Sequence, residues 1–180
     1  MKNTWRILAA VAALSLAACP SDENGGGNGT GSGSCTGTIS GALTGSVRTC
    51  TVMAEKLATN GELLYTITIE PATSGDVETI DDIIVSFMGD PKTGTFSGSA
   101  FRQFTGSIFG KDGNKQFDVQ LGFNDNRGSA TLVIDSVPTG EPAGNNTVYK
   151  GFNGRAQIQY TATPGTDSTG TVDLSLTFKR

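Results

Sequence analysis

The fold class of this chain is set by the stretch Thr171-Val172-Asp173-Leu174-Ser175-Leu176-Thr177-Phe178. Successive side chains of a strand point to opposite faces, so its apolar residues share one face and its Thr, Asp and Ser residues share the other. This alternation predicts a strand with one buried and one solvated face. We find no segment with a convincing helical period of apolar residues.

The same alternation recurs along the chain, which predicts an all-β fold. It is clear over residues 62–70, 116–123 and 155–163, where every second residue is apolar. Weaker candidates for strands are residues 38–44, 49–57, 82–88, 95–101, 103–109, 130–136 and 148–152. We therefore expect roughly 8–11 short strands.

Turn-forming residues separate these segments, which favours antiparallel neighbours. Asn60-Gly61, Asp112-Gly113 and Asn153-Gly154 are dipeptides that tolerate positive φ and are typical of tight hairpin turns. Longer connections of the same kind are predicted at residues 90–94, 124–128 and 164–168. Short connections join antiparallel strands, so we expect one antiparallel β-sandwich or β-barrel over residues 35–180.

The first residues have the features of a secretion signal. Lys2 and Arg6 precede a short apolar run, residues 7–14, which is too short to span a bilayer as a helix. The following Leu16-Ala17-Ala18-Cys19 resembles the lipobox of bacterial lipoproteins. That resemblance implies cleavage after residue 18 and thioether diacylation of the Cys19 sulfur, so the expected partner is a lipid bilayer.

The resemblance also gives an expected location, the bacterial cell envelope. The residue after the lipidated cysteine helps to decide sorting in Gram-negative bacteria, and Pro20 is not the Asp best known for inner-membrane retention, so we expect the outer membrane. Residues 20–34 are rich in Gly, Ser and Asn, with no apolar residue except Pro20. Such a segment cannot bury enough surface to fold, so residues 19–34 are predicted to be the lipidated cysteine and a flexible linker.

Two further cysteines, Cys35 and Cys50, remain in a compartment that oxidises thiols. We expect a disulfide between them. A metal pair and a reactive thiol are the alternatives, but two thiols in a chain without histidine make a poor zinc site, since structural zinc takes four ligands.

Several classes of function are disfavoured by what the sequence lacks. Loss of Lys2 and Arg6 takes the 13 basic residues to 11 against 17 acidic ones, so the net charge goes from −4 to −6 and nucleic-acid binding is not expected. The absence of histidine removes Ser-His-Asp and Cys-His nucleophile systems. The run at residues 106–112 fails as a phosphate loop in spacing and in its last residue. We predict no catalytic residue and no cofactor.

Carboxylates are what remains for chemistry. Asp76, Glu78, Asp81 and Asp82 form the densest acidic cluster, which could supply an acid/base pair for glycan hydrolysis or calcium ligands. Further oxygen-bearing turn residues are Asp112, Asn114, Asn124, Asp125 and Asn126. A solvated acidic loop is the simpler interpretation of the cluster.

The sequence therefore predicts an envelope lipoprotein whose β domain is a non-enzymatic binding or structural module. Its partner would be an envelope protein or a glycan. The two alternatives are a carboxylate-dependent hydrolase and a calcium-stabilised adhesion-like domain. Long connections at residues 71–79 and 137–147 would form the rim of any binding face.

Overall fold

A computed structural model describes residues 34–59, 62–111, 114–122, 126–144 and 146–179. The predicted signal peptide, Cys19, the linker up to residue 33 and the dipeptides Asn60-Gly61 and Asp112-Gly113 lie outside these ranges, as do Asn124 and Asp125. Within the described ranges, no helix is long and apolar enough to cross a membrane.

The described residues form thirteen strands and one short 3-10 helix, η1. In chain order the elements are β1 (Ser34–Gly41), β2 (Gly45–Thr59), β3 (Glu62–Gly75), β4 (Val77–Ile80), β5 (Ile83–Met88), β6 (Gly94–Ser97), η1 (Gly98–Ala100), β7 (Gln103–Gly110), β8 (Gln116–Leu121), β9 (Ser129–Ser136), β10 (Glu141–Ala143), β11 (Asn146–Lys150), β12 (Asn153–Ala162) and β13 (Thr171–Lys179).

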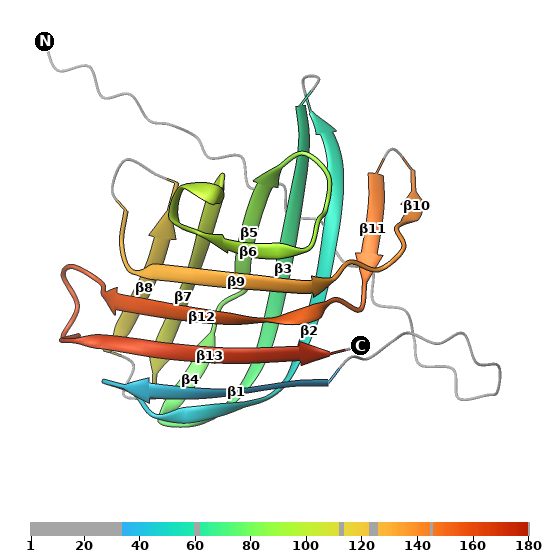
Figure 1. Ribbon diagram of the computed structural model, residues 1–180. Coiled ribbons are helices and arrows are strands. Elements are labelled where there is room, and N and C mark those ends of the chain that lie inside the picture. Colours follow the sequence, from blue (N-terminus) through green and yellow to red (C-terminus); the bar gives the residue numbers. More distant parts are fainter. Residues whose placement is uncertain (1–33, 60–61, 112–113, 123–125, 145, 180) are drawn as a thin grey trace, which may run out of the picture.

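The strands form two layers that cross one another and join at two sides (Figure 1). One layer has the order β1-β13-β12-β9-β6, and the other has the order β8-β7-β5-β3-β2, with β11 and β10 added beside β2 and β4 beside β7. All of these pairings are antiparallel. The layers are joined where β1 pairs with β2 and where the end of β12 pairs with β8. The predicted antiparallel all-β fold is confirmed, as a barrel-like sandwich that is nearly closed.

The core lies between the two layers and follows the predicted alternation. Val172, Leu174, Leu176 and Phe178 of β13 are all buried, whereas the residues between them are exposed. Strands β8 and β12 also place their apolar residues inward. One polar residue expected to face water, Asp118, is instead buried, where its carboxylate accepts hydrogen bonds from Thr163 Oγ1 at 2.7 Å and Gln116 Nε2 at 3.2 Å.

Three details of the predicted organisation are corrected. The strands are more numerous than the eight to eleven expected, because the short strands β4 and β10 carry too few residues to show an alternation. Residues 71–79 are not a loop, since β3 continues to Gly75 and β4 begins at Val77. Residues 137–147 contain β10 and the start of β11, which form an edge hairpin against β2.

Asn153-Gly154 is not a hairpin turn but the bulged start of β12. The chain passes from β11 in one layer to β12 in the other at Gly151, which has a φ of 80°. A Cβ at Gly154 would lie 2.2 Å from the Val133 carbonyl oxygen, so glycine is needed here for close approach of two strands and not for a turn.

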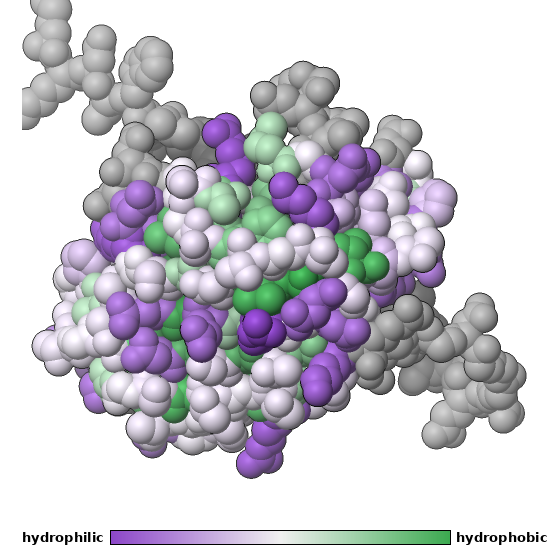
Figure 2. Space-filling model, in the orientation of Figure 1, coloured by the Kyte–Doolittle hydropathy of each residue, from purple (hydrophilic) through white to green (hydrophobic). Residues whose placement is uncertain are grey.

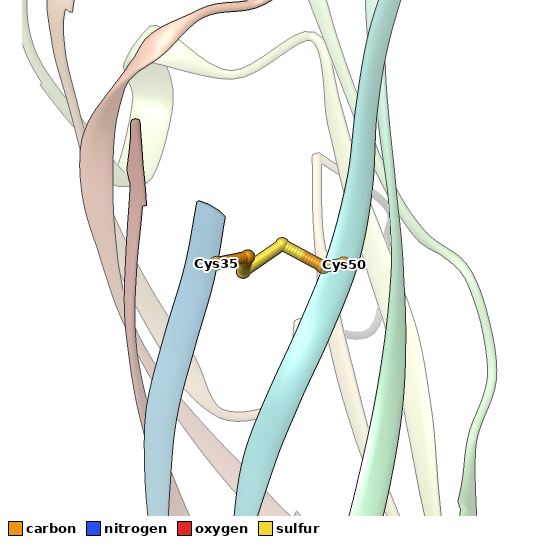
Figure 3. Close-up of a disulfide and its surroundings, with 2 residues drawn as sticks. All are labelled: Cys35 and Cys50. Carbon is orange, nitrogen blue, oxygen red and sulfur yellow. A yellow bond between two sulfur atoms is a disulfide. The ribbon is translucent and has the colours of Figure 1, made fainter. Parts of the chain in front are cut away.

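The predicted disulfide between Cys35 and Cys50 is present, and it closes the β1–β2 side of the sandwich (Figure 3). The β1–β2 ladder covers only Gly37 to Ile39 against Gly45 to Val47. Beyond it, the Cα atoms of the two cysteines are 5.2 Å apart. Continued in the same register, the β1–β2 ladder would place Cys35 opposite Thr49, so the bond to Cys50 is shifted by one residue. The β2–β3 ladder is irregular at the same place, between Val47 and Thr49. The crosslink therefore continues the hairpin past a bulge.

Candidate functional site

The clearest candidate site is a pocket at the corner where the two layers are not joined. There β6 and β9 of one layer face the ends of β5 and β8 of the other, and η1 crosses between the layers (Figure 1). We call this cavity of about 720 Å³ the corner pocket. It is lined by Phe87, Met88, Asp90, Lys92, Phe96, Gly98, Ser99, Ala100, Phe101, Arg102, Leu121, Gly122, Asn126 and Ile134.

Phenylalanine side chains form the wall of the corner pocket. Phe87 ends the buried face of β5, and its ring centroid lies 4.8 Å from that of Phe96 on β6 and 5.6 Å from that of Phe101 after η1. Phe101 continues inward to the fully buried Phe104 at 5.0 Å. These separations suit tilted aromatic packing. The wall is therefore the end of the core, continued into a cavity that opens to solvent.

The mouth of the pocket also exposes apolar surface. Met88 follows Phe87 and is 48% exposed, although large apolar side chains are usually covered. Figure 2 shows hydrophobic atoms at the surface around β5 and β6, with hydrophilic residues beside them. An apolar surface bordered by polar groups is typical of a ligand-binding site.

Charged residues stand at the lip of the pocket. Asp90, in the β5–β6 connection, pairs with Lys56 of β2, and this hydrogen bond raises the pKa of the Lys56 ammonium. Lys92 lies in the same connection, and Arg102 lies between η1 and β7. Both cations are exposed, and neither has an ion-pair partner within the described part of the chain. Asn126 completes the lip, where its Oδ1 accepts a hydrogen bond from the Gly122 N–H at 3.0 Å.

The backbone around Arg102 is held from two sides. Its N–H donates to the Ser86 carbonyl at 2.8 Å, which ties the segment to β5. At the end of β8, Gly122 has a φ of 83°, and a Cβ there would lie 2.3 Å from the Arg102 carbonyl oxygen. Glycine thus lets β8 approach Arg102 closely. These contacts fix the backbone position of Arg102 at the lip of the pocket.

The predicted acidic cluster lies at the other end of the sandwich, around β4 (Figure 1). All four carboxylates, Asp76, Glu78, Asp81 and Asp82, are exposed. Asp76 accepts a hydrogen bond from Thr44 Oγ1 at 2.5 Å. Among the described residues, no three acidic or cysteine side chains are grouped so that they could hold a metal ion. The structure therefore gathers no calcium site or acid/base pair from this cluster in the part that it describes.

Sequence reasoning missed the corner pocket for an identifiable reason. Phe87 lies in the predicted strand at residues 82–88, and Phe96 and Phe101 lie in the one at residues 95–101, so all three resembled ordinary core residues. The usable signal was the interruption of the second strand, where Gly98-Ser99-Ala100 forms η1 with three exposed residues. The expected rim at residues 71–79 and 137–147 does not line this cavity.

Comparison with known proteins adds no assignment. No family model matches the chain, and no curated protein or solved structure is significantly similar to it. The class of the protein is therefore defined by its fold and site, as an antiparallel β domain with one disulfide and a pocket at an unjoined corner.

Proposed function

We propose that this protein is a lipid-anchored lipoprotein of the bacterial envelope whose β domain binds a small amphipathic molecule in the corner pocket. The observation that carries the binding function is the phenylalanine wall of Phe87, Phe96 and Phe101 in a cavity open to solvent. The volume of about 720 Å³ lies within the range of small-molecule sites. Anchoring is supported by the lipobox-like Leu16-Ala17-Ala18-Cys19, and the outer membrane is the proposed location.

Binding would be driven by removing apolar surface from water. Each Å² of buried apolar surface contributes about 25 cal/mol before the cost of association. For a probe of about 17 non-hydrogen atoms at about 0.3 kcal/mol per atom, the binding free energy is about 5 kcal/mol, which gives a Kd on the order of 100 µM.

The test is titration with neutral N-phenyl-1-naphthylamine, whose fluorescence rises in an apolar site. The protein is the full chain carrying Cys19→Ser, which removes the acylated sulfur. Ser99→Trp fills the pocket from η1, where residue 99 is exposed to the cavity. Ser40→Trp is the matched control, because Ser40 is exposed on β1, away from the pocket.

We expect Ser99→Trp to weaken binding of the probe by at least tenfold and Ser40→Trp to leave it unchanged. A probe that binds both variants and the parent chain equally would place its site elsewhere, and the proposed pocket function would then be rejected.

A further inference from the structure

We infer that the ligand of the corner pocket carries an anionic group, such as a carboxylate, sulfonate or phosphate, which binds at Lys92 and Arg102. This inference rests on the proposed binding function and specifies the chemical class of the ligand. It concerns a small amphiphile with an apolar body and one negatively charged head.

Among the described residues, the unpaired charges at the lip of the pocket are opposite in sign to the net charge of the whole chain. The chain has a formal net charge of −4, yet both charged side chains of the pocket lining that lack an ion-pair partner in the described ranges are cations. The remaining charged residue of the lining, Asp90, is neutralised by Lys56 from outside the pocket. The lip therefore offers two positive charges that no described carboxylate balances.

The cations come from two different connections, so they can flank a ligand. Lys92 lies between β5 and β6, and Arg102 lies between η1 and β7. Arg102 directly follows Phe101, whose ring is part of the wall and is buried to all but 4% of its surface. A charged head at Arg102 would thus lie next to the apolar surface that receives the rest of the molecule.

The two side chains suit an oxyanion in complementary ways. A guanidinium donates two parallel hydrogen bonds to a carboxylate, sulfonate or phosphate group, and an ammonium adds a compact positive charge. Because both are exposed, solvent weakens the interaction, and about a tenfold gain in affinity from the pair together is expected rather than the larger effect of buried ion pairs.

The test compares two probes that differ in charge. Neutral N-phenyl-1-naphthylamine and its sulfonate, 1-anilinonaphthalene-8-sulfonate, share the same aromatic body. Both are titrated into the full chain carrying Cys19→Ser, alone and with Lys92→Gln plus Arg102→Gln. The matched control is Arg48→Gln plus Lys111→Gln, which removes one exposed arginine and one exposed lysine that do not line the corner pocket.

We expect the Lys92 and Arg102 substitutions to weaken sulfonate binding about tenfold and to leave the neutral probe unchanged. The control pair should leave both affinities unchanged. Raising the salt concentration should weaken only the sulfonate, because salt screens exposed charges.

The outcomes separate the inference from the proposed function. Equal sulfonate affinity in the pocket variant and the parent chain, with the neutral probe still bound, would reject the inference that the ligand is anionic. The proposed binding function of the pocket would then still stand. An equal loss in the control pair would also overturn it, because the effect would then be one of overall charge. Failure of the neutral probe to bind the parent chain would reject the proposed function itself.

Discussion

Loss of the Cys35–Cys50 crosslink should destabilise the domain by about 3 kcal/mol. The two cysteines are 15 residues apart in sequence, and a loop of that size removes about 3 kcal/mol of chain entropy from the unfolded state. For a domain of this size, that loss corresponds to a fall in Tm of roughly 6–12 °C.

The location of the disulfide explains why neighbouring interactions should not compensate for its loss. The β1–β2 ladder has three residue pairs, Gly37 to Ile39 against Val47 to Gly45, whereas β1 pairs with β13 over all eight of its residues. When the crosslink is removed, β1 can stay with β13 while the side facing β2 opens. The loss should therefore appear as reduced stability of the sandwich rather than as loss of β1 alone.

The assay is denaturant unfolding of the full chain carrying Cys19→Ser. The oxidised protein is compared with its reduced form, which keeps both cysteine side chains, and with Cys35→Ala plus Cys50→Ala. Cys35 is buried, so the alanine variant also loses packing and should be the least stable of the three. A reduced form within 1 kcal/mol of the oxidised form would refute the view that this crosslink closes the sandwich.

Four further predictions concern the core and the anchor. The hydroxyl of Tyr160 is buried with no hydrogen-bond partner among the described residues, so Tyr160→Phe should raise the free energy of unfolding by about 1 kcal/mol; a loss of stability would contradict this. Burial also raises the pKa of Tyr160, so above pH 10 this phenol ionises in the unfolded state but not in the folded state, and the stability of the protein falls; Tyr160→Phe should therefore lose less stability between pH 10 and 11 than the parent chain does. Leu132→Ala should cost about 2–5 kcal/mol by thermal or denaturant unfolding, because Leu132 is fully buried, whereas Val133→Ala on the half-buried face should cost markedly less. Cys19→Ala should leave the protein unprocessed or soluble by cell fractionation, and a variant still cleaved before residue 19 and bound to the membrane would reject the anchor.

Much of the fold could be predicted because side-chain alternation is a local property. The positions of Val172 to Phe178, Ala156 to Tyr160 and Phe117 to Leu121 fix which face of each strand is buried, whatever the partner strand is. The cysteine pairing was also accessible, because only two cysteines remained after the lipobox cysteine was set aside.

Strand pairing and local exceptions could not be predicted in this way. Strand β9 lies between β12 and β6, a long-range arrangement that no local pattern encodes. Asn153-Gly154 matches a hairpin turn in sequence, but the close approach of Val133 and Phe178 explains its glycine. The corner pocket depends on the long-range pairing of β6 with β9, because this pairing puts β6 and β5 in different layers.

The most direct test of the proposed function is to locate the bound probe by nuclear magnetic resonance. Backbone amide shifts of the full chain carrying Cys19→Ser would be followed during titration with N-phenyl-1-naphthylamine. We expect the largest saturable shifts at residues around the corner pocket, including Phe87, Ser99 and Leu121. Shifts centred on β4 or on the β10–β11 hairpin, or no saturable shifts at all, would contradict the account.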